Sequence, residues 1–388
     1  MLKERIESIL RTYRPERLSY EERLHLLEQL REAIGEEEGP LKSVREQLQG
    51  ILGQISSSDL KDLKRHHYFL NRLAIRTFDG SRSVKDVHLI CTRGRDAILR
   101  RILELIEAEF GSEIPPYAWM ALGSAGRQEE TLYTDQDYLL VYQDGAGDDL
   151  FLQFSHKAVD YLEEVGIRRC KGGVMPVNEK WRASLGLWQE RIRRTIEKGR
   201  GPLSSLDLMI LMDLRFVAGE RSLGEELMGM VPELTKNRGL LNEMLRTLIF
   251  IPMPLGLFGR FLVEKDGPHK GRINLKTGGW APLVVLIRVM AVSYGIRDLS
   301  TLERIEGLKH QGVISLRLAE DLKEAYHILM ELRISGQREL MLRGEEDSNY
   351  IDPYALDPEG QRQLKFALRR VEELQKVANE LFFGRGRW

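Results

Sequence analysis

Two apolar runs between residues 117 and 142 frame a polar stretch. The first run, residues 118–122, ends at Gly123 and Ser124, and the second, residues 138–142, begins directly after Asp135-Gln136-Asp137. Short apolar runs bounded by glycine and polar residues are typical of buried strands. The pattern therefore predicts two strands, with a small-residue turn after the first and two carboxylates at the start of the second.

Helical patterns surround these strands. Apolar residues recur at three- and four-residue steps over residues 81–110 and again over residues 150–165, which predicts an amphipathic helix in each range. Pro115 and Pro116 separate the first helix from the first strand. Residues 167–175 predict a further strand. We therefore expect an α+β core with a small mixed sheet.

Both ends of the chain are expected to be helical. Residues 18–34 and 41–52 predict two amphipathic helices, because Gly35 and Gly39-Pro40 are expected to break the pattern between them. Residues 206–217 predict one continuous apolar helix. Long amphipathic helices are expected at 316–343 and 358–383. The expected domains are an N-terminal helical region at 1–80, the core at 81–190, and an all-α C-terminal domain at 191–388.

Composition narrows the class of protein. The 388 residues include 58 Lys plus Arg and 59 Asp plus Glu, and a net charge of -1 does not indicate nucleic-acid binding. Cys91 and Cys170 are the only cysteines, which fits a reducing compartment. The start of the chain is charged, and the longest apolar stretch, residues 248–258, contains two prolines. We expect a cytoplasmic protein with no nucleic-acid partner and no membrane partner.

The two carboxylates are the strongest chemical signal in the sequence. Side chains alternate along a strand, so Asp135 and Asp137 project to the same side. Paired carboxylates suit a hard divalent cation such as Mg²⁺, which keeps coordination positions for substrate phosphates. Gly123 leaves room for a close ligand, and Ser124 adds a hydroxyl beside the start of a short helix. The alternative is an Asx turn that enters an ordinary strand.

This stretch resembles the signature of the DNA polymerase β-like nucleotidyltransferase superfamily: an apolar residue, Gly-Ser, about ten residues, then Asp-any-Asp. The fuller strings GSAGRQEETL and TDQD resemble a branch grouped with the amino-terminal domain of protein-PII uridylyltransferase. A later segment also matches that branch, at Cys170, Gly172, Gly173, Val174, Met175, Asn178, Trp181 and Arg182. Segments after residue 206 resemble the substrate-binding domain of the same family, at Asp213-Leu214-Arg215, Lys276, Arg288, Thr301 and Arg304.

The resemblance implies a nucleotidyltransferase that moves a nucleoside monophosphate from a nucleoside triphosphate, UTP or ATP, to an acceptor hydroxyl. Asp135 and Asp137 would be the catalytic residues and would hold Mg²⁺ or Mn²⁺. Nucleotide-binding roles fall on Gly123, Ser124, Arg127, Lys276 and Arg288. The acceptor implied first is a protein in a signal-transduction pathway, as for protein-PII uridylyltransferase. A homodimer through the helical regions is a further expectation.

Several alternatives stay open at this point. Many members of the superfamily carry a third carboxylate on a later strand, whereas residues 167–175 contain no Asp and Glu179 is a weak candidate. A site without that carboxylate is compatible with a nucleotide-binding regulator that performs no transfer. Arg127 could instead cap Glu129 or Glu130, and Lys276 and Arg288 could form structural ion pairs. The acceptor could be a small molecule.

Overall fold

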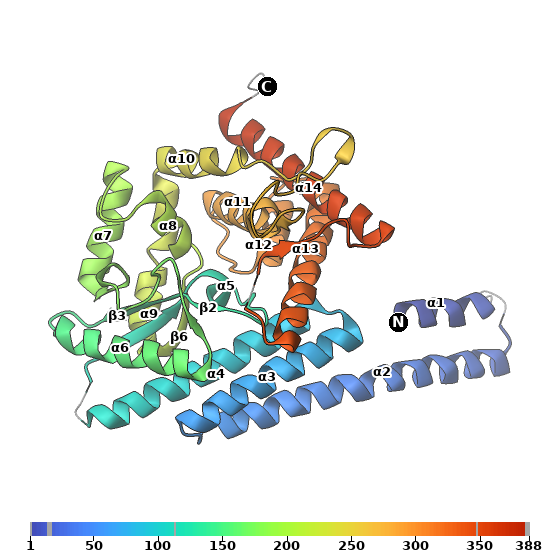
Figure 1. The fold of residues 1–388 in the computed structure, drawn as a ribbon, viewed down its shortest axis with the longest axis horizontal. Helices are drawn as coiled ribbons and strands as arrows, with labels where there is room; N and C mark the ends of the chain where they lie inside the picture. The colour runs from blue at the N-terminus through green and yellow to red at the C-terminus, as the bar shows by residue number, and fades with distance from the viewer. Residues whose placement is uncertain (1, 14–17, 112–113, 347, 385–388) are drawn as a thin grey trace. The chain divides into compact units, whose positions relative to one another are not determined.

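The computed structural model describes residues 2–13, 18–111, 114–346 and 348–384. The chain divides into two compact units, Met1–Ser57 and Ser58–Trp388. Helices dominate both units, and the strands that the structure describes lie in the second (Figure 1). A largely helical chain with small sheets agrees with the expected fold class. The domain boundaries expected after residues 80 and 190 stay predictions.

The first unit is a pair of helices that contact each other, α1 (Leu2–Thr12) and α2 (Tyr20–Ile55). A capping box starts α2, because Ser19 Oγ accepts from the Glu22 N–H and the Glu22 carboxylate accepts from the Ser19 N–H. The break expected at Gly35 and Gly39-Pro40 was wrong, since α2 is continuous through them. A proline removes only its own backbone hydrogen bond, and a long helix can bend there without ending.

The second unit begins with α3 (Leu60–Ser81) and α4 (Val84–Phe110), which pack against each other. The helix expected at 81–110 is thus confirmed with its start at Val84. Asp59 caps α3, Ser83 caps α4, and Gly111 ends α4 in a left-handed conformation.

A four-stranded mixed sheet forms the centre of this unit, in the order β5-β3-β1-β6. Its strands are β1 (Tyr117–Ala121), β3 (Tyr138–Tyr142), β5 (Arg182–Ser184) and β6 (Arg215–Gly219). β1 is antiparallel to β3 and β6, whereas β5 is parallel to β3. All residues of β1 and β3 are buried, so helices must cover both faces of the sheet. Helices α4, α6 (Asp148–Val165), α7 (Leu185–Lys198) and α9 (Arg221–Met228) contact it.

Two expectations for the core were wrong. The helix expected at 206–217 ends early: α8 covers only Ser205–Leu211, and the chain then turns into β6 beside β1. The strand expected at 167–175 shrinks to β4 (Arg168–Arg169), which pairs in parallel with β2 (Asp135–Gln136). Gly173, at φ +70°, turns the chain after β4, and a left-handed turn cannot continue a strand.

The remainder of the chain is a helical assembly with short connecting elements. α13 (Leu316–Arg343) and α14 (Pro358–Phe383) match the ranges expected from the sequence and pack against each other. The helices are α10 (Arg238–Ile249), α11 (Ala281–Ser293), α12 (Thr301–His310), α13 (Leu316–Arg343) and α14 (Pro358–Phe383). The short elements are a four-residue turn α5 (Gly123–Gly126), η2 (Glu179–Trp181), η3 (Val231–Lys236), η4 (Leu257–Gly259), η5 (Lys276–Trp280), and the pair β7 (Ile273–Asn274) and β8 (Tyr350–Ile351).

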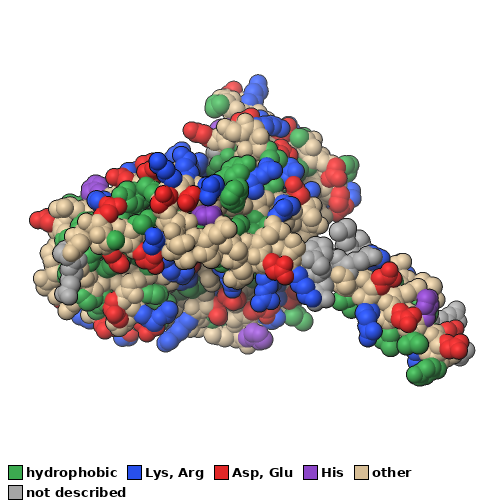
Figure 2. Space-filling view, turned by 90° about the horizontal axis from the view of Figure 1, so that it is seen from below, with side chains coloured by type: hydrophobic (Ala, Val, Ile, Leu, Met, Phe, Trp, Pro, Cys, Tyr) green, Lys and Arg blue, Asp and Glu red, His purple; other side chains and the backbone are tan. Residues whose placement is uncertain are grey.

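Charge is distributed evenly where it can be seen. On the face drawn in Figure 2, basic and acidic side chains are interspersed.

Among the helices that the structure describes, none combines the length and apolar character needed to cross a bilayer.

Candidate functional site

The turn after β1 brings backbone against a carboxylate. β1 leads through Leu122 into α5, whose first residue, Gly123, has φ +55°. A Cβ added to Gly123 would lie 2.7 Å from Asp137 Oδ2. Glycine is needed here for two independent reasons, because other L-residues strain at this φ and because a side chain would displace the carboxylate. The structure thus brings Gly123, Ser124 and Asp137 together.

Asp135 and Asp137 follow the predicted alternation. Gln136 between them is fully buried, and its Nε2 donates to Val159 O (3.1 Å) and Ile167 O (2.8 Å). The two carboxylates therefore project away from that buried side, and the Asp135 side chain is 40% exposed. Burial raises the pKa of Asp137 to about 6, and the Asp135 charge adds to the increase.

Two polar groups, from Cys170 and Arg168, contact the pair. The Cys170 thiol forms a hydrogen bond with Asp137, and the Sγ atom accepts from the backbone at Gly172 and Val174. Arg168 Nη2 lies 3.4 Å from Asp135 Oδ1, and its guanidinium stacks over the Tyr133 ring. β4 supplies Arg168 and Cys170 follows it directly, so the pairing of β2 with β4 positions both groups.

Lys276 reaches the same site from the helical part of the chain. Its ammonium lowers the pKa of Asp137, so it lies within electrostatic range of that carboxylate. The Lys276 ammonium is 5.8 Å from the centre of the Trp280 ring, and the Arg333 guanidinium is 4.4 Å from the centre of the same ring. A cation pair beside an aromatic ring suits an anionic ligand with a flat group.

Arg127 and Arg288 pair with the buried Asp213, and Arg127 also lies within electrostatic range of Asp137. Arg127 Nη1 donates to Asp213 Oδ2 (2.6 Å) and its Nε donates to Glu129 Oε2 (2.7 Å). Arg288 Nη2 is 2.7 Å from Asp213 Oδ2, and Arg304 Nη1 donates to Asp213 Oδ1 (2.7 Å). We call Asp213, Arg127, Arg288, Arg304 and Glu129 the arginine cluster.

Electrostatics in the arginine cluster are those of structural ion pairs. Burial works against the charge of Asp213, but Arg288, Arg127 and Arg304 together hold the pKa of its carboxyl below the ordinary value. Burial lowers the pKa of Arg288 to about 10, and Arg127 and Arg304 add to that effect. The geometry at Arg127 and Arg288 supports the ion-pair alternative over direct nucleotide contact.

The sheet does not supply a third carboxylate beside the pair. β5, the strand parallel to β3, contains Arg182, Ala183 and Ser184. Arg182 Nε and Nη2 donate to the Asp148 carboxylate, each at 2.8 Å. Glu179 is exposed on η2. In the described part of the chain, no group of three or more His, Cys, Asp and Glu side chains is arranged to hold a metal.

The residues present nevertheless fit a hard cation that takes its other ligands from a phosphate. Two carboxylates project together, one of them partly exposed, and the glycine turn leaves space beside the other. Mg²⁺ often binds through one or two carboxylates plus substrate phosphates, so two protein ligands are compatible with it.

Two family models match the chain. Residues 69–201 match the family described as Putative nucleotidyltransferase DUF294, and residues 238–382 match the Putative nucleotidyltransferase substrate binding domain. Together they cover more than two thirds of the sequence, and the chain belongs to this nucleotidyltransferase family. No curated protein matches the chain.

The first match contains the Gly123 turn, both aspartates and Cys170, and the second contains Lys276, Trp280, Arg288 and Arg333. The site described above is therefore built from both matched segments. Sequence reasoning missed Arg168, Cys170 as a partner of Asp137, Trp280 and Arg333. The match to the family motif at Cys170 was a signal for that residue.

Proposed function

We propose that the chain transfers a nucleoside monophosphate from UTP or ATP to a hydroxyl group of an acceptor protein. The observation that carries this proposal is the contact of Gly123 with Asp137, beside Asp135 and within range of Lys276. The contact brings the backbone of a glycine turn against one carboxylate of the pair, within electrostatic range of a cation. Family membership supports the same class of reaction.

In the proposed reaction the acceptor oxygen attacks the α-phosphorus in line. A bond forms between that oxygen and phosphorus, the bond from phosphorus to the β-phosphate oxygen breaks, and pyrophosphate leaves. The hydroxyl proton passes to solvent or to a carboxylate of the site. A Mg²⁺ ion held by Asp135 and Asp137 would offset the charge on the triphosphate. Gly123 and the Ser124 hydroxyl contact the phosphates, and Lys276 pairs with their negative charge.

Incubation with α-³²P-labelled UTP or ATP, Mg²⁺ or Mn²⁺, and an extract of the source cells tests this function. Label is expected to appear on a protein band, and EDTA is expected to abolish it. Asp135→Asn and Asp137→Asn keep the side-chain size and should each reduce labelling by at least 100-fold. Glu179→Gln is the matched control and should keep activity. Label on a small molecule alone would contradict the protein acceptor.

A second function, nucleotide sensing without transfer, is favoured by β5, which lacks a carboxylate beside β3. Isothermal titration calorimetry separates the two. Nucleotide sensing predicts saturable binding of Mg²⁺ and nucleotide that depends on Asp135 and Asp137. If such binding is found and no label reaches any acceptor in the extract, sensing is the function and the transfer reaction is refuted. A homodimer through the helical regions, the cytoplasmic location and a signalling role remain predictions.

A further inference from the structure

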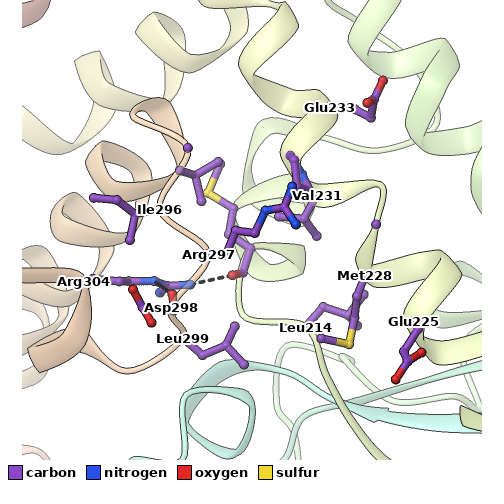
Figure 3. A pocket seen from close by; sticks show the side chains of 15 residues that line it. Leu214, Glu225, Met228, Val231, Glu233, Ile296, Arg297, Asp298, Leu299 and Arg304 are labelled. Atoms are coloured by element: carbon purple, nitrogen blue, oxygen red, sulfur yellow. Dashed lines mark hydrogen bonds between the residues drawn. The ribbon is translucent and has the colours of Figure 1, made fainter. Parts of the chain in front are cut away.

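A cavity of about 370 Å³ is lined in part by Arg304 of the arginine cluster, and neither aspartate of the pair lines it (Figure 3). Its walls come from the turn into β6, from α9 and η3, and from the loop between α11 and α12. The apolar lining residues are Met212, Leu214, Met228, Val231, Val292, Ile296 and Leu299. The volume lies within the range of small-molecule sites.

Charged residues at the cavity already have protein partners or lie in solvent. Arg304 donates to Asp213, to Met212 O (2.6 Å) and to Asp298 O (2.8 Å). Its guanidinium is thus already hydrogen-bonded to protein groups of the cavity wall. Glu225 pairs with Arg221 at 3.5 Å, and Glu233 pairs with Lys236. Figure 3 shows Glu225 and Glu233 on the opposite side of the cavity from Arg304.

Arg297 and Asp298 also line the cavity; both are exposed and they are opposite in sign. A charged ligand would lose hydration inside the cavity, and an ion pair with the exposed Arg297 or Asp298 would add little in return. An uncharged ligand gains from the apolar wall instead. Met212 and Met228 can adapt their side chains to its shape. This chemistry selects an uncharged and largely apolar molecule.

The cavity wall is linked to the glycine turn through backbone. Met212 and Leu214 line the cavity and flank Asp213 in the sequence. The Asp213 carbonyl oxygen lies so close to Gly126 that a Cβ on Gly126 would be 1.9 Å from it. The Asp213 carboxylate also binds Arg127, the residue directly after α5.

A displacement of the 212–214 segment would therefore be transmitted to α5 at two points, one through backbone contact and one through an ion pair. The first residue of α5 is Gly123, which contacts Asp137. Coupling of this kind requires a contiguous physical connection, and the connection runs from the cavity to the phosphate-binding turn.

We propose that this cavity is an effector site for an uncharged apolar small molecule, and that its occupancy changes the affinity of the Gly123 turn for nucleotide. The coupling rests on the proposed function, whereas binding in the cavity does not. The site is distinct from the nucleotide site, because its lining includes neither aspartate of the pair nor any residue of α5.

Calorimetric titration with three indoles of different charge tests the binding. The probes are 3-methylindole, which is neutral, indole-3-acetate, which is anionic, and tryptamine, which is cationic. Saturable binding of 3-methylindole is expected, with the charged probes at least tenfold weaker. Met228→Trp and Val231→Trp each fill the cavity and should abolish binding. Leu206→Trp, at an exposed position outside the lining, is the matched control and should bind normally.

Thermal unfolding of each variant checks that it is folded. If one of the two cavity-filling variants, Met228→Trp or Val231→Trp, does not fold, the other serves as the test. Absence of saturable 3-methylindole binding to the wild type would overturn the proposal. Binding that survives in both folded filled variants would do the same, because the probe would then sit elsewhere. Equal or tighter binding of a charged probe would contradict the ligand class.

The affinity for Mg²⁺ with UTP or ATP, measured with and without saturating 3-methylindole, tests the coupling. A change of at least threefold is expected in the wild type and none in Met228→Trp. Linkage requires that the nucleotide change the 3-methylindole affinity by the same factor. Unchanged nucleotide affinity, or direct competition between probe and nucleotide, would overturn the effector role. If no nucleotide binds at all, the proposed function fails, while the indole titration still decides the apolar site.

Discussion

Gly123 and Asp137 meet so closely that the position of a Cβ on Gly123 falls 2.7 Å from Asp137 Oδ2. This contact places the backbone turn at Gly123 directly against the carboxylate pair, with no side chain between them. It also makes Gly123 a position of the site that tolerates a methyl group poorly.

Gly123→Ala is expected to destabilise the protein by about 1–2 kcal/mol, because alanine is strained at φ +55°. Nucleotide binding should weaken by a larger factor than stability alone explains, since the methyl group displaces Asp137. Gly336→Ala is the matched control: it lies inside α13 with no atom near the new Cβ and should stabilise by about 0.5–1 kcal/mol. Urea unfolding and nucleotide titration check both variants, and equal effects at the two glycines would refute the contact.

Asp213→Asn leaves Arg127, Arg288 and Arg304 without the charge that all three share. Breaking a buried ion pair typically costs about 3–5 kcal/mol, and a loss in that range is expected from urea unfolding. Asp79→Asn removes the partner of Arg338 at a partly exposed pair and should cost less than about 1 kcal/mol. A similar, small loss at both positions would show that Asp213 is not the centre of the cluster.

Glu130 gives the stability of the protein a dependence on pH. Burial raises the pKa of its carboxyl to about 7, although Arg95, with Nη1 3.7 Å from Oε1, offsets part of the effect. The folded state therefore holds a proton that the unfolded state releases near pH 4.5. The stabilisation is present below pH 4.5 and is lost as the pH rises through about 7.

Glu130→Gln has no such proton. The stability of the wild type relative to this variant should fall by roughly 3 kcal/mol between pH 4.5 and pH 8, as a pKa difference of this size implies. Urea unfolding of both proteins across that range measures the difference. A difference independent of pH would mean that Glu130 stays ionised in the folded protein.

Lys276→Met should weaken the binding of nucleoside triphosphate with Mg²⁺ by about tenfold, the equivalent of about 1.4 kcal/mol for one lost charge contact. The effect should shrink in high salt, because exposed charges are screened. Lys265→Met, at an exposed lysine outside the site, is the control and should bind normally. Unchanged affinity in Lys276→Met would remove this residue from the nucleotide site.

Local sequence patterns predicted the parts of the site that depend on neighbours in the chain. Alternation along a strand was enough to place Asp135 and Asp137 on one side, and the burial of Gln136 agrees with it. Gly123 could be identified because the turn needs a residue without a Cβ. The long helices at 316–343 and 358–383 were also within reach, because their periodicity extends over many turns.

Parts that depend on pairing between distant segments were not predicted. Residues 206–217 are apolar except for Asp207, Asp213 and Arg215. Such a run does not distinguish a buried helix from a helix followed by a strand, and the pairing of β6 with β1 decides between them. Arg168 lies at Asp135 only because β4 pairs with β2. The sequence left Arg127 and Arg288 open between nucleotide contacts and ion pairs, because their common partner, Asp213, is distant from both in the sequence.

Gln136 has a consequence for how the proposed site would discriminate between divalent cations. Its fully buried side-chain amide donates hydrogen bonds to Val159 O and Ile167 O. Rotation of the backbone between the two aspartates would break both hydrogen bonds. The carboxylates are thus preorganised, and little conformational entropy is lost when an ion arrives. Adaptation to ions of different radius must then come from the mobile phosphate chain, so discrimination between Mg²⁺ and Mn²⁺ is expected to depend on which nucleotide is bound.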